Sequence, residues 1–249
     1  MSAENQRYAI EVRDLVKQFG LFKAVDQISF TVSPGEIFGL LGANGAGKTT
    51  AMKILCGLSR PTSGLARVAG FNASKEQEQI KKNIGYMSQK FSLYEDLTVW
   101  ENFWFYGGIY GMSSAGIKQK FGELMDRLRF TGQHKTLVRA LPLGWKQKLA
   151  FSVAVFHSPA IVFLDEPTGG VDPVVRRQFW DLIYEAAERG TTVVVTTHYM
   201  DEAEYCGRLS IMVDGKIHAL GSPAGLKQEW ACQSMDELFL KLARNKPAQ

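Results

Sequence analysis

The sequence predicts an α/β fold with a parallel sheet, and three strand-like runs carry this prediction. EIFGLL (36–41) is a short apolar run, and IVFLD (161–165) and TTVVVTT (191–197) are rich in β-branched side chains. Such runs are typical of strands that are buried on both faces. The segment between the last two runs has helical spacing, so we expect a strand–helix–strand unit with two parallel strands.

The helix expected between these strands has a clear start. Asp172 is a favourable N-cap residue, and Pro173 is favoured at the first helical position. The apolar side chains that follow recur at helical spacing, at Val175, Phe179, Leu182, Ile183 and Ala186.

The rest of the chain predicts two further parts. Residues of about 90–157 show helical patterns and few strand signals, which indicates an inserted helical subdomain. After Gly207, the sequence predicts a hairpin and then two short helices, with a helical tail at about 222–249. The first strand-like run ends in a glycine-rich loop that leads into another helix.

Composition excludes several classes of protein. The 249 residues carry a net charge of +4 without a run of five basic residues, which is too weak to indicate nucleic-acid binding. The three cysteines have no metal-binding spacing, so we expect reduced thiols in the cytosol. We find no apolar signal core at the N-terminus and no membrane-spanning stretch, so a membrane role requires a partner.

The loop GANGAGKT (42–49) fits the pattern G-x-x-x-x-G-K-[ST] between a strand and a helix. Its glycines let the backbone wrap closely around a phosphate, and the helix N-terminus attracts the phosphate charge. Lys48 is expected to bridge the β- and γ-phosphates, and the Thr49 hydroxyl to hold Mg²⁺.

Asp165 and Glu166 stand at the end of an apolar strand. Next to a phosphate loop, the aspartate is expected to hold Mg²⁺ and the glutamate to polarise the attacking water. His198 follows the next strand at the edge where open α/β sheets bind ligands, so we expect it to contact the γ-phosphate.

In this order, the segments resemble the ATP-binding subunit of an ABC transporter, from Val12 to about Leu242. GANGAGKT matches the Walker A motif, and IVFLDE matches Walker B followed by the catalytic glutamate, Glu166. TTH places His198 as the switch histidine, and GGVD places Asp172 in the D-loop. The resemblance implies one domain over 1–249: a P-loop NTPase core (1–88 and 158–249) with a small antiparallel β part, and a helical subdomain (89–157).

The resemblance also implies the ligands, ATP and Mg²⁺. Gln89 matches the Q-loop glutamine, a Mg²⁺ ligand, and Phe19 the aromatic residue that stacks on adenine. Taken alone, Asp172 also fits a helix cap, Phe19 also fits strand packing and Gln89 fits a solvated loop residue. The implied metal ligands are Thr49, Gln89 and Asp165, and the implied ATP-binding residues are Phe19, Gly42, Ala43, Asn44, Gly45, Ala46, Gly47, Lys48, Thr49 and Thr50.

One family motif is altered. The signature Leu-Ser-Gly-Gly-Gln, which touches the ATP of the opposite subunit in a dimer, aligns with Leu141, Pro142, Leu143, Gly144 and Trp145. Pro142 has neither a hydroxyl nor an N–H, and Leu143 adds a Cβ where glycine accepts every backbone angle. The lost hydrogen bond is worth ~1.5–3 kcal/mol, or roughly tenfold to over a hundredfold in rate.

Two dimers fit this alteration. In a heterodimer, a partner with a normal signature would give one strong and one weak site, and this chain would be the weak-signature half. In a homodimer, Gly144 and the helix end would suffice, with Lys146 and Lys148 adding positive charge. The sequence slightly favours the homodimer, because the chain stands alone with an initial methionine.

Within the family, QKFSLYEDLTVWEN, LDEPTGGVDP and THYMDEAEYC resemble the ATPases of ABC-2-type exporters. The expected partner is therefore a separate ABC-2-type permease, with the chain peripheral on the cytoplasmic face of the inner membrane and no nucleic-acid partner. The region VWENFWFYGGIYG (99–111) and the Gln89 loop would form its docking groove, lined by some of Phe91, Leu93, Tyr94, Phe103 and Tyr106.

Other functions stay open. A soluble, non-transport ABC ATPase is the main alternative, although such proteins usually carry tandem domains or long coiled-coil insertions. A P-loop kinase would lack the series Glu166, Asp172 and His198, and a regulatory subunit without turnover would have no need of Glu166.

Overall fold

The computed structural model describes residues 8–89, 93–130 and 134–244. A six-stranded sheet forms the centre, in the order β10-β9-β3-β8-β7-β6, and β10 is antiparallel to its neighbour while the other pairs are parallel. Its strands are β3 (Ile37–Leu41), β6 (Ile84–Met87), β7 (Ile161–Asp165), β8 (Thr192–Thr197), β9 (Arg208–Val213) and β10 (Lys216–Gly221).

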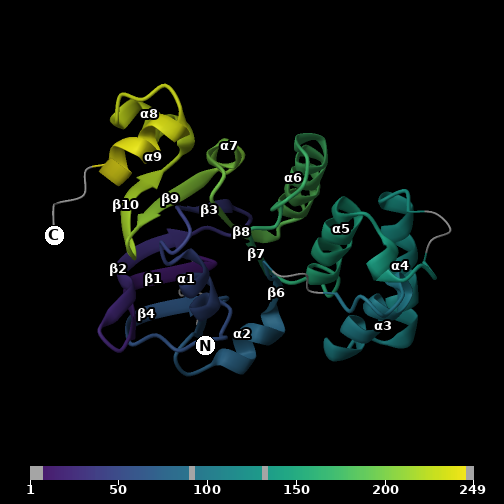
Figure 1. Cartoon of the computed structure of the whole chain (residues 1–249). Coiled ribbons are helices and arrows are strands. Elements are labelled where there is room, and N and C mark those ends of the chain that lie inside the picture. Colours follow the sequence, from purple (N-terminus) through teal and green to yellow (C-terminus); the bar gives the residue numbers. More distant parts are fainter. Residues whose placement is uncertain (1–7, 90–92, 131–133, 245–249) are drawn as a thin grey trace.

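A second, four-stranded sheet is antiparallel, in the order β2-β1-β4-β5. It lies beside α1, in purple and blue in Figure 1. This is the small antiparallel part that the family resemblance implied. Its strands are β1 (Ile10–Phe19), β2 (Phe22–Val32), β4 (Ser63–Val68) and β5 (Phe71–Asn72).

The helices cover the sheets and form the insertion. They are α1 (Lys48–Leu55), α2 (Gln77–Asn83), α3 (Val99–Ile109), α4 (Ser114–Arg127), α5 (Leu143–Ala154), α6 (Pro173–Glu188), α7 (Met200–Ala203), α8 (Pro223–Glu229) and α9 (Met235–Arg244), with a 3-10 turn at Val138–Ala140. Together, the sheets and helices confirm the predicted α/β class.

The predicted strand–helix–strand unit is confirmed. Strands β7 and β8 are parallel neighbours, with Asp165 opposite Thr196, and α6 connects them. Asp172 caps α6 by accepting hydrogen bonds from the amides of Val174 and Val175, and Pro173 is the first helical residue. The unit therefore brings the segments after Asp165 and after Thr197 to the same edge of the sheet.

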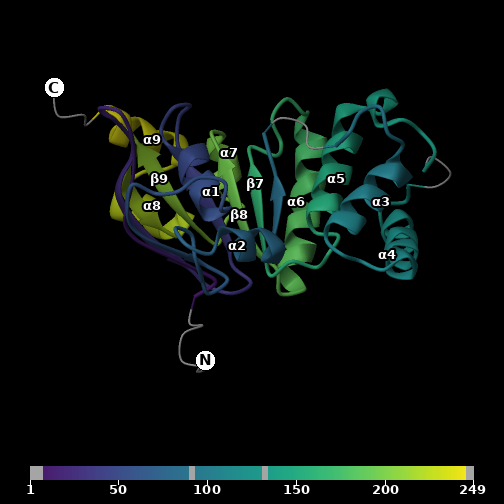
Figure 2. The same cartoon turned by 90° about the horizontal axis from the view of Figure 1, so that it is seen from below.

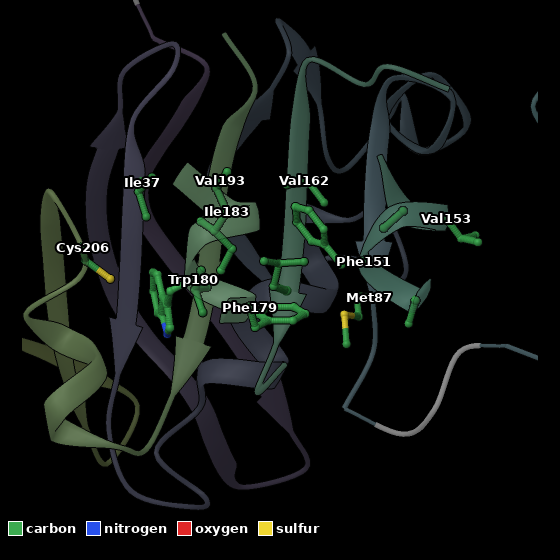
Figure 3. Close-up of a cluster of buried hydrophobic side chains, with 14 of the residues drawn as sticks. Ile37, Met87, Phe151, Val153, Val162, Phe179, Trp180, Ile183, Val193 and Cys206 are labelled. Carbon is green, nitrogen blue, oxygen red and sulfur yellow. The ribbon is translucent and has the colours of Figure 1, made fainter. Parts of the chain in front are cut away.

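The central strands bury both faces, as their continuous apolar sequences predict. On β3, Phe38 and Leu40 point into a core shared with the antiparallel sheet and α1, while Ile37 and Leu41 join the core under α5 and α6. Figure 3 shows this second core, where Phe179, Trp180 and Ile183 of α6 lie near Val193 and Val162.

The helices α3, α4 and α5 gather at one end of the molecule, away from α1 in both views (Figures 1 and 2). Helix α5 meets the sheet at its C-terminal end, where a Cβ on Gly85 would lie 2.0 Å from the carbonyl oxygen of Ala154. Only glycine permits this close approach. These helices lie within the predicted subdomain 89–157, whose exact limits stay a prediction.

The C-terminal part has the predicted order of a hairpin, β9–β10, and two helices, α8 and α9. Helix α9 packs Met235, Leu238 and Leu242 into the second core and leaves Leu240 exposed. Among the residues that the structure describes, no helix has the length and apolarity needed to cross a membrane.

Candidate functional site

The loop 42–49 lies against the backbones of β2 and β9. A Cβ on Gly47 would lie 2.3 Å from the Ala24 carbonyl oxygen, and one on Gly42 would lie 2.4 Å from that of Met212. Neither position has room for a side chain, so both glycines are required by packing. Gly47 also adopts a positive φ of 102° and caps α1 without a side-chain hydrogen bond.

The rim of this loop, from Ala43 to Gly45, is exposed, whereas Ala46 and Lys48 are buried. The Lys48 ammonium donates hydrogen bonds to the carbonyl oxygens of Gly42 (2.7 Å) and Ala43 (3.0 Å). Burial lowers the pKa of Lys48, and the nearby Glu166 opposes that shift. The charge that would meet a phosphate is therefore held inside the loop.

Asp165 lies at the end of β7 with its carboxylate between two hydroxyl groups. Its Oδ1 accepts hydrogen bonds from Thr196 Oγ1 at 2.6 Å and from Thr49 Oγ1 at 3.2 Å. The cluster brings together a carboxylate and a hydroxyl, which are oxygen donors suited to Mg²⁺. Thr49 and Asp165 thus fit the predicted metal site.

Glu166 begins the turn after β7 in the left-handed region, with a φ of 49°. Its amide is fixed by donating to both the carbonyl oxygen and the hydroxyl of Thr196, at 3.1 and 3.0 Å. This anchoring turns the side chain toward the phosphate loop, where Oε1 lies 3.5 Å from the Lys48 ammonium. A non-glycine residue at positive φ is strained, and such strain is common at functional sites.

The other oxygen of Glu166 meets two predicted site residues. Gln89 donates from Nε2 to Oε2 at 2.9 Å, and His198 places Nδ1 3.1 Å from the same oxygen, without the alignment of a hydrogen bond. One carboxylate therefore joins the phosphate loop, the segment after β6 and the segment after β8. In this arrangement Gln89 contacts Glu166 through its amide nitrogen.

Phe19 lies at the tip of the β1–β2 hairpin, paired with Phe22 and more than half exposed. The Lys17 ammonium sits 5.0 Å from the centre of its ring. Strand β2 continues to Ala24, whose carbonyl faces Gly47. An exposed aromatic ring suits stacking on a base, and that role stays a proposal.

The altered signature divides into buried and exposed residues. Leu141 is buried in the core, and Trp145 packs against Phe130 with ring centres 4.7 Å apart. Only Pro142 and Leu143 are clearly exposed, at an α5 N-terminus that has no side-chain cap. Leu141 and Trp145 therefore pack beneath the turn, and of the signature residues Pro142, Leu143 and in part Gly144 are accessible for the predicted trans contact.

The two lysines of this helix are already engaged. Lys146 forms an ion pair with Glu95 at 2.8 Å, and Lys148 donates to the Gln178 side chain at 2.7 Å while lying over the Trp145 ring. Both side chains are thus tied within the chain rather than directed at the turn.

The predicted D-loop residue, Asp172, serves as the cap of α6 described above. The turn before it is connected to α5, because Gln147 donates from Nε2 to the Gly169 carbonyl oxygen at 3.1 Å. Sequence reasoning missed Gln147 and Thr196. The signal for Thr196 was its position opposite Asp165 in the expected parallel pair, whereas nothing local marked Gln147.

Two of the residues considered for the docking groove are buried, and the groove itself stays a prediction. Phe103 is fully buried, with its ring against Phe121 and Phe156, and Leu93 is also buried, so neither can line a groove. Phe91 lies outside the described residues. The predicted Tyr94 is exposed, and Tyr106 is partly buried against Tyr94 and Phe105. Further exposed apolar side chains of this region are Trp104, Phe105 and Ile109.

Buried polar contacts hold Tyr94 in place. Asn102 is fully buried and pairs with the backbone of Tyr94, accepting from its amide at 2.9 Å and donating to its carbonyl at 3.0 Å. A capping box between Thr98 and Glu101 starts α3 next to it. The backbone that carries the exposed Tyr94 ring is therefore held in place.

Comparison with known proteins agrees with this geometry. The family model described as "ABC transporter" matches residues 25–169, which is more than half of the chain. The chain is 46% identical over 240 residues to the probable multidrug ABC transporter ATP-binding protein YbhF of Escherichia coli strain K12, an alignment that covers 94% of this chain but only 41% of YbhF.

Other relatives are matched over more of their length. The chain is 34% identical over 218 residues to the linearmycin resistance ATP-binding protein LnrL of Bacillus subtilis strain 168, covering 87% of this chain and 70% of LnrL. A solved ATP-binding subunit of an ABC transporter superposes with a TM-score of 0.84 at 26% identity, covering 94% of this chain and 99% of that structure. The matched motifs, the relatives and the shared fold together show that this chain belongs to the ABC transporter family, as an ATP-binding domain.

Proposed function

We propose that this chain binds and hydrolyses ATP to drive export through a separate ABC-2-type membrane permease. The observation that carries the proposal is the convergence on Glu166, whose carboxylate lies beside Lys48, Gln89 and His198 at the mouth of the phosphate loop. The names of the relatives, which include multidrug and resistance proteins, favour export.

The phosphate loop has the shape to bind ATP. Its exposed rim and the N-terminus of α1, which has no side-chain cap, would face the phosphates, and the Lys48 ammonium would exchange the carbonyl oxygens of Gly42 and Ala43 for phosphate oxygens. Thr49 and Asp165 would hold Mg²⁺, which supplies charge neutralisation between the phosphates. Phe19 would stack on the adenine.

Glu166 is the proposed general base. Exchange of Lys48 from Glu166 to phosphate leaves the carboxylate free to accept a proton from the attacking water. His198 is partly exposed beside it and would hold the γ-phosphate in line. Because two hydroxyls hold the Asp165 carboxylate, we expect Asp165 to act as a metal ligand and Glu166 to act as the base.

The dimer is the second part of the proposal. The signature turn lies at α5, apart from α1 in both views, so we expect it to contact the ATP of another subunit rather than its own (Figures 1 and 2). A head-to-tail dimer would bring Leu143, Gly144 and the α5 N-terminus to a second subunit's ATP. We favour a homodimer slightly over a heterodimer, in which this chain would provide the weak signature.

ATP hydrolysis tests the enzymatic part. The purified chain is expected to release phosphate in a Mg²⁺-dependent reaction that Glu166→Gln abolishes. The matched control is Glu123→Gln, an exposed carboxylate on α4, which leaves the rate unchanged. Equal rates in all three proteins, or no hydrolysis by the unaltered chain at any concentration, would contradict the proposal.

Cross-linking in membranes tests the permease part. The cysteines Cys56, Cys206 and Cys232 are buried, so a thiol-specific cross-linker should react mainly with a single cysteine added on the surface. Tyr94→Cys is expected to cross-link to a membrane protein, whereas Leu220→Cys, on the distant strand β10, is the control. Cross-links to ribosomal proteins, or none from Tyr94→Cys, would instead favour a non-transport ATPase.

A further inference from the structure

A buried carboxylate outside the nucleotide site joins the two loops that carry Glu166 and His198. Glu202, on α7, is fully buried and accepts a hydrogen bond from the hydroxyl of Thr168. Thr168 is itself buried, two residues beyond Glu166 in the turn after β7. Glu202 follows His198 by four residues in the segment after β8. The contact thus spans both catalytic segments.

The positive charge that faces Glu202 comes from a third element. Arg176, on the second turn of α6, places Nε 3.6 Å from Glu202 Oε1 and donates from its terminal nitrogen to Asp201 at 2.9 Å. Its side chain is largely buried. A buried carboxylate requires such a partner, because leaving it unpaired would be strongly destabilising. The pair therefore fixes α7 against the start of α6.

From Arg176 the contacts continue to His198. The guanidinium lies 4.2 Å from the centre of the Tyr199 ring, in a cation–π arrangement. The Tyr199 ring lies in turn 4.2 Å from that of His198, and the Tyr199 amide donates to Thr197 Oγ1 at 3.0 Å. A continuous path of contacts thus leads from the turn after Glu166 to the imidazole of His198.

This path differs from the contacts of the nucleotide site. None of the interactions of Glu202, Thr168 or Arg176 described here involves residues 42–50. Glu202 also keeps one oxygen, Oε2, buried without a hydrogen-bond partner. Burying a carboxylate with an unsatisfied oxygen costs more free energy than burying a neutral side chain of similar shape, so packing alone does not explain Glu202.

We infer that Glu202 is a positioning residue: through Thr168 and Arg176 it holds the side chains of His198 and Glu166 in the relative positions that ATP hydrolysis requires. The inference rests on the proposed function, because it assigns a role within that reaction. Since the path avoids the phosphate loop, its loss should lower kcat and leave the affinity for ATP unchanged. This separates it from the residues that bind phosphate.

The decisive variants alter the hydroxyl that Glu202 binds. Thr168→Val keeps the shape but removes the donor, and it is expected to lower kcat about tenfold to a hundredfold, as for loss of a hydrogen bond to a charged group, with KM within about twofold. Thr168→Ser restores the hydroxyl and is expected to restore kcat. Glu202→Gln retains an acceptor for Thr168 but loses the charge facing Arg176, and an intermediate rate is expected.

The matched control is Glu204→Gln, two residues further along the same segment. Glu204 is partly exposed and pairs with Lys227, so its variant should hydrolyse ATP at the unaltered rate. Thermal unfolding of each variant shows whether the fold is retained. Equal losses of kcat in Thr168→Val and Thr168→Ser, or a rise in KM without a fall in kcat, would overturn the inference.

A second readout does not depend on turnover. The chain has four histidines, so the ¹⁵N imidazole signals can be assigned with a His198→Ala variant. Thr168→Val is expected to shift the His198 signals while those of His134, His157 and His218 stay in place. An unchanged His198 spectrum would overturn the inference. If the unaltered chain fails to hydrolyse ATP, the proposed function fails, and this spectrum still decides the positioning role.

Discussion

The ammonium of Lys48 lies 3.5 Å from Oε1 of Glu166, and both side chains are almost fully buried, at 3% and 8% exposure. Lys48 also donates to two carbonyl oxygens of its own loop. The phosphate-binding cation and the proposed base are therefore paired with each other in this structure. Binding of a phosphate would compete with Glu166 for Lys48, so the same event that binds ATP would free the base.

Neutralising Glu166 should separate binding from hydrolysis. Glu166→Gln removes the base and is expected to reduce hydrolysis by about 10²–10⁴-fold. It also removes the anion that competes for Lys48, so ATP affinity should rise. Equilibrium binding of a fluorescent ATP analogue and single-turnover hydrolysis measure the two effects. Weaker binding by Glu166→Gln would show that the pair does not compete with phosphate.

The sequence was sufficient wherever a motif fixes its own geometry. The phosphate loop lies between a strand and a helix, so its shape follows from local sequence. The strand–helix–strand pattern implied that β7 and β8 are parallel, and the structure adds the register that places Thr196 opposite Asp165. Local patterns and the rules of sheet topology were therefore enough to predict the fold class and the edge of the sheet at which the candidate site residues lie.

Sequence reasoning was insufficient where a side chain's role depends on distant packing. Phe103 was one of the residues considered for the docking groove, but it is covered by Phe121 of α4 and by Phe156, just after α5. Lys146 is paired with Glu95, 51 residues away, so its charge does not point at the signature turn. Helical spacing identifies an apolar stripe, but it does not say which neighbour covers the stripe.

Restoring the signature turn tests whether it limits turnover. The double variant Pro142→Ser with Leu143→Gly returns a hydroxyl and a flexible backbone to the exposed α5 N-terminus. If the trans contact limits hydrolysis in a homodimer, the rate should rise about tenfold or more. Val174→Ser, at another exposed apolar position, is the control. An unchanged rate would show that the altered turn does not limit this chain's hydrolysis.

Gly144 is predicted to be required because of packing between α5 and α6. A Cβ at this position would lie 2.6 Å from Cγ1 of Val175, a stiff branched side chain next to the cap of α6. Gly144→Ala should therefore destabilise the fold by about 1–3 kcal/mol, as overpacking does. Urea unfolding measures the change. Adding Val175→Ala creates the missing space, and failure of this second change to restore stability would contradict the packing explanation.

His157 predicts how stability depends on pH. Its ring stacks on Tyr110 with centres 3.5 Å apart, and Nε2 lies 3.2 Å from the Ile84 carbonyl oxygen. Burial, assisted by the nearby Lys120 charge, lowers the pKa of His157 from 6.5 to about 4. The unfolded chain therefore binds more protons than the folded chain between these values, and the free energy of unfolding should fall as pH falls through this window.

The full effect on the free energy of unfolding is up to about 3 kcal/mol, from the width of the pKa shift. Urea unfolding at pH 7, 5.5 and 4 measures it. His157→Gln can still donate to the Ile84 carbonyl but has no proton to gain, so its stability should depend less steeply on pH. His218→Gln removes an exposed histidine and should leave the slope unchanged. If His157→Gln keeps the full slope, acid destabilisation arises from the carboxylates instead.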